Sequence, residues 1–488
     1  MTTKIYTDEQ KNIFDAVENS DCNIVVNALA GTGKTTTAVE VVNRLPKNKR
    51  LGFCAFNKHI ANELSSRLGS KAECRTLHSF GFRELSKRFF PTVEDRKVRK
   101  IVRMLTKNTR MSAADKLATE DLVYYAKMLF CELTILTADE ITRRFGLSIS
   151  DHGMVLNTAS RALEISTNDT NTIDYADMIY LPLALKMQMP EFDFLVGDES
   201  QDWNPCQQKL ALALCPSKRM MPIGDVNQSI YSFSGADPDS IPNLTRRLRS
   251  RHTTRELPLT MTWRCPKSHV ELAKQIVPEF RAHPSAMEGF HDVESESWMI
   301  ANANVGDMIL CRTNAPLVKL AYTFIKGKRP VHMRGRDIGR GLILLLDSLF
   351  ARDIQHLGKR LAEFEENETA RLTAKDADEA ALESLRDRCE CLAVFMGMSS
   401  TLDEMRRHIT DLFTDDESPT NYINLSSIHK AKGLEAERVF IVEPERLPLK
   451  WKDQTDVEAQ QELNILYVAL TRSKSELYFI GGMPHGIE

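Results

Sequence analysis

The chain has 488 residues, of which 42% are hydrophobic and 27% charged, and 64 basic against 67 acidic residues give a net charge of −3. This composition is ordinary for a globular protein and excludes a disordered chain or a collagen-like fibre. The longest apolar-rich stretch, 341–350, is far shorter than the ~20 residues that a bilayer crossing needs. The N-terminus lacks the apolar core of a secretory signal and the ten cysteines are scattered, so we expect a reduced, cytoplasmic protein.

Short apolar runs predict buried parallel strands in two regions of the chain. The first region holds 23–27, 51–56, 192–198 and 220–225. The second region holds 307–312, 422–426, 438–442 and 476–480. Each run ends in polar or glycine-rich residues, where an α/β sheet places its ligand-binding loops. The pattern predicts an α/β fold with two parallel-sheet lobes.

Two helix-rich stretches interrupt these lobes. Residues 83–185 and 342–416 carry few strand signals and many helix formers, so we expect one helical insertion in each lobe. The first lobe would then comprise 1–82 and 186–258, and the second lobe 259–341 and 417–488.

The segment ALAGTGKT, at residues 28–35, follows a predicted strand and precedes a predicted helix. It is a P-loop in which Ala28 replaces the usual first glycine. Gly31 and Gly33 allow a turn whose backbone N–H groups cradle phosphates. Lys34 can reach the β- and γ-phosphates, and the Thr35 hydroxyl can bind Mg²⁺. The predicted nucleotide contacts in this segment are Ala30, Gly31, Thr32, Gly33, Lys34, Thr35 and Thr36.

Two adjacent carboxylates end the strand-like run FLVGDESQD, at residues 194–202. Asp198 would bind Mg²⁺, and Glu199 would orient and deprotonate an attacking water. An Asp-Glu pair after a strand is usually a solvated strand end. It indicates catalysis here because a P-loop precedes it in the same chain.

Six ordered motifs together resemble the UvrD/Rep branch of superfamily 1 DNA helicases. After AGTGKT and DESQD come GDVNQSIYSFSGA (224–236), TWRCP (262–266), SIHKAKGLE (427–435) and ELNILYVALTR (462–472). FCAFNK (53–58) and CRTLHS (74–79) are most similar to the F-box DNA helicases and their small phage and bacterial relatives. The resemblance implies two RecA-like lobes and a bacterial cell, or a phage's host cell, as the location.

The resemblance implies roles for residues that have no signal of their own. Gln10 would hydrogen-bond the edge of the adenine base, and Glu435 would hydrogen-bond the ribose. Trp263 stands where the family has a tyrosine that stacks on adenine. Thr36 replaces a basic residue that often stacks on the base, so Trp263 would carry more of the packing.

The same resemblance implies three residues that act on the γ-phosphate. Gln228 would sense it, whereas Arg264 and Arg472 would act as arginine fingers from the second lobe. Taken alone, each arginine would be an ordinary ion-pair residue.

For nucleic acid, the resemblance implies a groove of aromatic and polar side chains. Phe233 would stack on a base at a position where relatives carry tryptophan. The further expected contacts are Phe56, Asn57, His78, Ser427 and His429. Basic residues also cluster at 87–110, 246–255 and 326–340, although such clusters usually mark only a solvated face.

The sequence thus predicts an ATP- and Mg²⁺-dependent helicase and translocase on single-stranded DNA, moving 3′→5′. We expect a monomer that engages single strands and single-strand/duplex junctions. One alternative is a DNA-stimulated ATPase that displaces bound proteins without processive unwinding. A second alternative is a scaffold that binds nucleotide without turnover.

Overall fold

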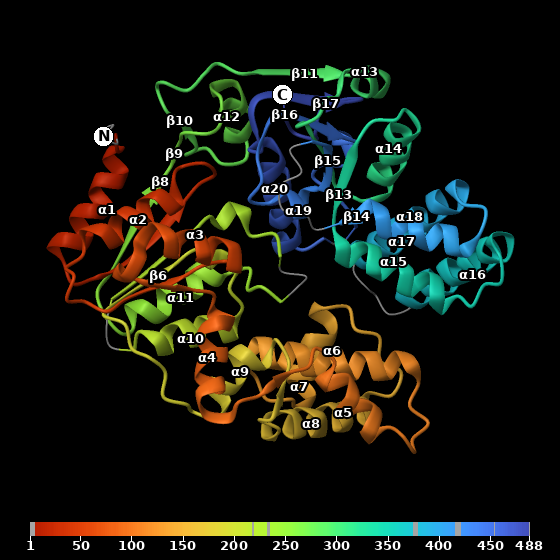
Figure 1. Ribbon diagram of the computed structural model, residues 1–488, viewed down its shortest axis with the longest axis horizontal. Coiled ribbons are helices and arrows are strands. Elements are labelled where there is room, and N and C mark those ends of the chain that lie inside the picture. Colours follow the sequence, from red (N-terminus) through yellow and green to blue (C-terminus); the bar gives the residue numbers. More distant parts are fainter. Residues whose placement is uncertain are drawn as a thin grey trace. The chain divides into compact units, whose positions relative to one another are not determined.

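The computed structural model describes residues 5–216, 219–231, 235–373, 379–414, 421–452 and 454–487. The chain forms two compact units, Met1–Thr260 (unit 1) and Met261–Glu488 (unit 2) (Figure 1). Each unit is built on a parallel sheet, which confirms the predicted α/β fold with parallel sheets in two regions. No described helix is long and apolar enough to span a membrane.

The sheet of unit 1 has six parallel strands in the order β3-β2-β6-β7-β1-β8. The strands are β1 (Asn23–Ala28), β2 (Leu51–Cys54), β3 (Glu73–Arg75), β6 (Phe194–Gly197), β7 (Arg219–Gly224) and β8 (Thr254–Leu259). The four predicted strands are its central members. The two edge strands were not predicted, because β3 is three residues long and β8 carries exposed charged residues instead of an apolar run.

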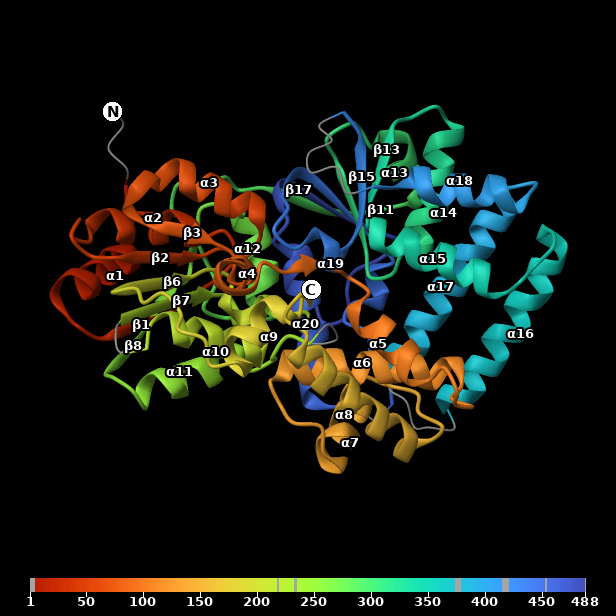
Figure 2. The same cartoon turned by 60° about the horizontal axis from the view of Figure 1, so that its bottom comes forward.

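Helices cover both faces of this sheet, and each face has its own apolar core. One face packs against α1 (Asp8–Asn19), α2 (Lys34–Arg44) and α3 (Lys58–Leu68). The other packs against α4 (Leu77–Phe89), α9 (Asp177–Ala184), α10 (Pro205–Leu214) and α11 (Ser240–Arg249). Figure 2 shows α2 and α3 on one side of the strands and α10 and α11 on the other. A sheet buried on both faces explains why its strands are continuous apolar runs.

A group of helices lies between α4 and α9 in the chain and has a separate core. It comprises α5 (Lys97–Leu105), α6 (Ala113–Leu129), α7 (Ile135–Arg144) and α8 (His152–Asn168), with the short paired strands β4 (Thr92–Val93) and β5 (Thr172–Ile173). Val102, Leu122 and Val155 are fully buried in this core. Figure 2 shows the group, in orange to yellow, beside α9 and α10. Residue 83, the predicted start of this insertion, lies inside α4.

Two lysines and two aspartates are buried together where this helical group meets α9. Lys127 lies 2.7 Å from Asp177 Oδ1 and 2.8 Å from Asp174 Oδ2, and Lys97 lies 2.8 Å from Asp177 Oδ2. Lys127 Nζ also donates to the Ser166 hydroxyl at 2.9 Å. Lys97 was expected on the basic surface of 87–110, and that expectation was wrong, because its side chain is 2% exposed.

The sheet of unit 2 has seven parallel strands in the order β11-β17-β16-β12-β15-β13-β14. They are β11 (Phe290–Glu294), β12 (Met308–Cys311), β13 (Val331–Arg334), β14 (Phe413–Thr414), β15 (Ile423–Ser427), β16 (Ala436–Val442) and β17 (Ser473–Ile480). The four predicted strands are all present. Those missed are β11 and β13, which carry charged or histidine side chains, and the two-residue β14.

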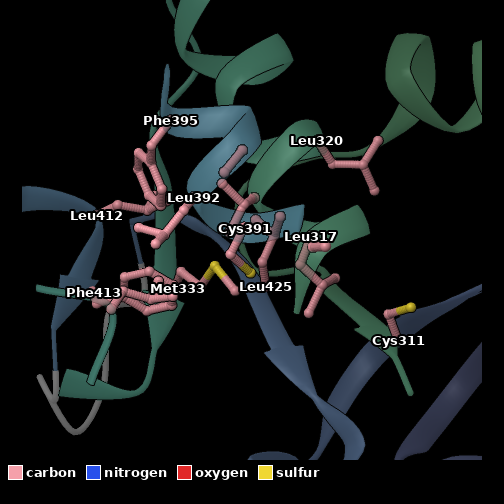
Figure 3. Close-up of a cluster of buried hydrophobic side chains, with 14 of the residues drawn as sticks. Cys311, Leu317, Leu320, Met333, Cys391, Leu392, Phe395, Leu412, Phe413 and Leu425 are labelled. Carbon is pink, nitrogen blue, oxygen red and sulfur yellow. The ribbon is translucent and has the colours of Figure 1, made fainter. Parts of the chain in front are cut away.

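The described helices of unit 2 are α12 (Lys267–Lys274), α13 (Glu296–Asn302), α14 (Ala315–Lys326), α15 (Arg336–Ser348), α16 (Ile354–Thr373), α17 (Glu379–Met398), α18 (Leu402–Leu412), α19 (Ile428–Ala431) and α20 (Asp456–Leu470). Helices α13 to α18 share one large apolar core with the sheet. Figure 3 shows Leu392 and Phe395 of α17 beside Leu412, Phe413 and Met333. This segment therefore packs as part of unit 2, and residue 342, where the insertion was predicted to begin, lies inside α15.

The buried ion pairs predict a stability change. Lys127→Ala leaves the carboxylates of Asp174 and Asp177 short of a cation inside the protein, and breaking a buried pair in this way costs about 3–5 kcal/mol. Urea unfolding should show that loss, whereas Lys107→Ala, at an exposed lysine of the same helical group, should change stability by less than about 0.5 kcal/mol. Equal effects of the two substitutions would contradict the structural role of the network.

Candidate functional site

Three neighbouring strands of unit 1 deliver the motif residues to one edge of the sheet. The order β6-β7-β1 makes these strands adjacent, with Val26 paired to Ile223 and Leu195 paired to Met220. Because the strands are parallel, their carboxyl ends lie together, which is where open α/β sheets bind ligands. The P-loop follows β1, Asp198 follows β6 and Asp225 follows β7.

The P-loop has the backbone that phosphate binding requires. Gly31 and Gly33 have φ values of 68° and 83°, in the left-handed region that glycine enters without steric cost. The Thr32 hydroxyl donates to the Leu29 carbonyl at 2.8 Å and fixes the turn. Helix α2 begins at Lys34, so its free N–H groups and positive dipole end lie at the loop. Ala30 is buried, whereas Thr35 and Thr36 are half-buried in the first turn of α2.

Gln10 is fixed against this loop. Its side chain closes a capping box with Thr7 at the start of α1, and its Nε2 donates to the Thr37 hydroxyl of α2 at 2.9 Å. Thr37 in turn donates to the Gly33 carbonyl at 3.0 Å. Gln10 is only 3% exposed, although the sequence alone would make it a surface residue. The structure thus brings Gln10 to the P-loop, and adenine reading by this residue stays a prediction.

The two carboxylates after β6 face the P-loop lysine. Lys34 Nζ lies 3.8 Å from Glu199 Oε1, and Gln201 Nε2 donates to Glu199 Oε2 at 2.6 Å. Glu199 has φ 48°, an uncommon value for a residue with a side chain and one that often marks a functional site. Asp198 is 2% exposed, and burial followed by the charge of Glu199 raises its pKa to about 7, against the opposing charge of Lys34.

A third carboxylate, that of the buried Asp225, completes the cluster. Gln228 Nε2 donates to Asp225 Oδ2 at 2.6 Å, and the Asp225 backbone N–H donates to Gln201 Oε1 at 3.0 Å. Burial is the main reason that the pKa of Asp225 is raised. Asp225 and Gln201 had no predicted role, although Asp225 lies in the motif at 224–236 and Gln201 in the motif at 194–202. Gln201 joins the end of β6 to the end of β7, so Gln228 and Glu199 belong to one hydrogen-bonded network.

This cluster fits a nucleotide with Mg²⁺. Asp198, Glu199 and Asp225 place three carboxylates around Lys34, so additional positive charge is favoured there. Mg²⁺ is usually held by one or two carboxylates together with phosphate oxygens. Within the described ranges, no three His, Cys, Asp or Glu side chains gather as a ready-made metal cage. The Asp198 carboxylate and the Thr35 hydroxyl are the groups predicted to hold Mg²⁺, and this assignment stays a prediction.

Unit 2 holds the remaining predicted nucleotide residues. Arg264 forms an ion pair with Glu435, and Lys474 Nζ lies 2.7 Å from the other Glu435 oxygen. Burial alone would raise the pKa of Glu435, but Arg264, Lys474 and Arg472 outweigh it and lower that pKa. Glu435 therefore stays ionised between two cations. Lys474 was missed because no motif includes it.

Arg472 is held more tightly than a surface arginine. Its side chain is 1% exposed and donates to the carbonyls of Val468 and Leu434 at 2.8 and 3.1 Å, and to the Thr471 hydroxyl at 2.9 Å. Trp263 is 41% exposed and stacks on His283, with 3.7 Å between ring centroids. Gln10 and Lys34 thus belong to unit 1, whereas Trp263, Arg264, Glu435 and Arg472 belong to unit 2.

The residues expected to contact nucleic acid differ in accessibility. Phe56 is 47% exposed just after β2, and Asn57 caps α3 by accepting from the Ile60 backbone N–H at 2.9 Å. His78 is half-buried, and burial lowers its pKa. Phe233 lies outside the described residues.

The two candidates in unit 2 are less open. Ser427 is 6% exposed at the start of α19. Burial, followed by the charges of Arg312, Lys430 and Lys432, lowers the pKa of His429 to about 3. His429 is therefore neutral at physiological pH and can offer a phosphate only a hydrogen bond.

Of the basic residues in 87–110, Lys97 is buried and the others are exposed.

A P-loop on a parallel sheet, with ionisable side chains at adjacent strand ends, defines a P-loop nucleotide-binding protein. Two family models then specify the family. The UvrD/REP helicase N-terminal domain matches residues 7–249, and the UvrD-like helicase C-terminal domain matches residues 349–481. The chain belongs to the UvrD/REP helicase family, as its motifs indicated. Trp263, Arg264 and His283 lie between the two matched segments.

The chain is also similar to individual curated proteins. A probable DNA helicase II homologue of Mycoplasma pneumoniae is 26% identical over 65% of this chain and 59% of that protein. F-box DNA helicase protein 1 of Schizosaccharomyces pombe is 24% identical over 97% of this chain and 57% of that protein. The ATP-dependent DNA helicase PcrA of Staphylococcus aureus is 22% identical over 95% of this chain and 82% of that protein. The chain thus spans less than two thirds of the first two relatives.

The raised pKa of Asp198 predicts a pH-dependent stability. A carboxylate whose pKa is higher in the folded protein than in the unfolded protein destabilises the fold when it is ionised. The free energy of unfolding therefore falls as the pH rises through about 7. In chelator and without nucleotide, Asp198→Asn should raise the melting temperature by several degrees at pH 8, since ~1 kcal/mol shifts it by about 2–4 °C in a domain of this size. The gain should shrink at pH 5.

The matched control is Asp95→Asn, at an exposed aspartate of the same unit. This substitution should leave the melting temperature unchanged at both pH values. A gain for Asp198→Asn that is the same at pH 5 and pH 8 would contradict the burial of an uncompensated charge.

Proposed function

We propose that this protein is an ATP-dependent helicase that translocates on single-stranded DNA, most simply as a monomer moving 3′→5′. The observation that carries the proposal is the cluster at the ends of β1, β6 and β7, where Lys34 faces Glu199 at 3.8 Å and Gln201 links Glu199 to the Asp225–Gln228 pair. Membership of the UvrD/REP helicase family and the name of PcrA, an ATP-dependent DNA helicase, support it.

Each residue of the cluster has a chemical task in this proposal. The P-loop N–H groups and Lys34 bind the phosphates, and Asp198 with Thr35 holds Mg²⁺, which neutralises phosphate charge when bound. Glu199 accepts the proton of the attacking water, and Gln201 keeps that carboxylate oriented. Gln228 lies in the same hydrogen-bonded network, so a change at the γ-phosphate would reach the segment that continues toward Phe233.

The residues of unit 2 have the complementary tasks. Arg264 and Arg472 would stabilise charge that develops on the γ-phosphate, and Glu435 would bond the ribose. Trp263 would stack on adenine, and it would carry more of the packing because Thr36 replaces the basic residue that often stacks on the base. Phe56, Asn57, His78, Ser427, His429 and Phe233 remain proposed contacts to single-stranded DNA and its junctions.

Two measurements test this function. The ATP hydrolysis rate should rise on addition of single-stranded DNA and fall to background in Lys34→Ala. A partial duplex with a 3′ single-stranded tail should be unwound faster than one with a 5′ tail. Hydrolysis without strand separation, together with removal of a protein block from the strand, would support the translocase alternative. Nucleotide binding with no hydrolysis in any DNA would contradict an ATP-driven motor.

Glu199→Gln should keep ATP binding but lose nearly all turnover. The amide is almost isosteric with the carboxylate and cannot take a proton, and loss of a general base typically lowers the rate ~10²–10⁴-fold. Gln201 can still contact the amide, so the local fold should be preserved. DNA-stimulated hydrolysis and equilibrium binding of an ATP analogue measure the two effects. A variant that retained more than about a tenth of the rate would show that another group is the base.

Arg264→Ala and Arg472→Ala should each lower kcat far more than nucleotide affinity. Both guanidinium groups are proposed to act on charge that appears in the transition state, so their loss is seen in kcat. Arg472 is also bonded to Val468 and Leu434, so Arg472→Lys and a thermal melt accompany its test. Lost affinity with an intact kcat would place these arginines outside the reacting phosphate.

A further inference from the structure

Trp263 and His283 are brought together by a two-stranded ribbon in unit 2. Strands β9 (Met261–Thr262) and β10 (Arg281–Ala282) pair in parallel, with Ala282 opposite Thr262. The next residue of each strand is therefore Trp263 and His283. The His283 backbone N–H donates to the Thr262 carbonyl at 2.9 Å and extends the pairing to this position.

The two rings stack directly on each other. Their centroids are 3.7 Å apart and their planes differ by 21°, a close parallel contact. Stacked aromatic pairs stabilise each other beyond the area that they bury. The stack covers one face of the indole, yet Trp263 remains 41% exposed. The tryptophan thus offers its opposite face as a flat apolar surface.

The imidazole is itself held in place by a local turn. Its Nδ1 accepts from the Ser285 backbone N–H at 3.2 Å and lies 2.7 Å from the Ser285 hydroxyl. The Ala286 backbone N–H donates to the His283 carbonyl at 2.8 Å, which closes the turn. Because Nδ1 accepts from a backbone N–H, this hydrogen-bond pattern assigns the proton of the neutral ring to Nε2.

We propose that His283 is a positioning residue that backs the indole of Trp263 and presents its free face to the base of the bound nucleotide. This inference rests on the proposed function, in which Trp263 stacks on adenine. An unsupported tryptophan would lose side-chain freedom on binding the base, whereas a backed one has lost it already. His283 would therefore strengthen binding through the base while having no part in the chemistry at the phosphates.

The predicted effect is a selective loss of nucleotide affinity. His283→Ala should raise the KM for ATP about 2- to 12-fold, the range that corresponds to immobilising one side chain, with kcat within about twofold of the parent. Inhibition by inorganic tripolyphosphate, which has no base, should be unchanged. His283→Phe keeps a ring against the indole and should restore the KM of the parent. Trp263→Ala should raise the KM at least as far as His283→Ala.

The outcomes separate this inference from the proposed function. If Lys34→Ala abolishes hydrolysis while His283→Ala leaves the KM for ATP unchanged, the motor assignment stands and the role of His283 is overturned. If His283→Ala weakens tripolyphosphate as much as ATP, or His283→Phe fails to restore the KM, His283 is only a structural residue. If no variant affects hydrolysis, Lys34→Ala included, the proposed function itself fails. A melting temperature for each variant verifies that it is folded.

Discussion

The candidate site depends on one electrostatic constraint, the placement of two buried carboxylates, Asp198 and Asp225, and the half-buried Glu199 around the ammonium of Lys34. Three adjacent parallel strand ends bring these groups together, and burial raises the pKa of Asp198 to about 7. Such an arrangement is costly in an isolated protein, because ionised carboxylates lose their water without full compensation. Proteins accept this cost at functional sites, where a ligand supplies the missing charge. Mg²⁺ together with a nucleotide would supply it here.

In unit 2, the charged groups of the candidate site already have hydrogen-bond or ion-pair partners within the unit. Glu435 lies between Arg264 and Lys474, and Arg472 is bonded to backbone carbonyls. These cations are held in fixed positions and not left to solvent. An arginine fixed in advance loses less freedom when it engages a phosphate, which suits a group that must act on developing charge. In the proposed function, both arginines act on charge that develops at the γ-phosphate.

The central strands and the P-loop could be predicted because their signals are local. Strands buried on both faces are continuous apolar runs, and a glycine-rich loop before a helix has a fixed spacing. The edge strands β8 and β11 carry exposed charged residues, so no local pattern distinguishes them from loops. Lys97 reads as one of many surface cations, and only the fold shows that Asp177 neutralises it in the interior.

Contacts between residues that lie far apart in the sequence could not be predicted either. His283 lies 20 residues after Trp263 and belongs to no motif, and Lys474 follows the last motif. Gln201 lies in the motif at 194–202 and Asp225 in the motif at 224–236, but the hydrogen bond between them depends on the adjacency of β6 and β7. Family resemblance assigned roles to residues such as Gln10 and Glu435. The burial of Gln10 and the ion pairs of Glu435 came from the fold alone.

Proton release on binding of a magnesium–nucleotide complex tests the central constraint most directly. Isothermal titration of an unhydrolysable ATP analogue, repeated in buffers of different ionisation enthalpy, counts the protons released. At pH 7 the wild-type protein should release roughly half a proton from Asp198, because binding a cation requires the ionised carboxylate and its pKa is about 7. That release should vanish at pH 9 and in Asp198→Asn. Proton release at pH 7 that is no greater than at pH 9, or the same release in Asp198→Asn, would contradict the account.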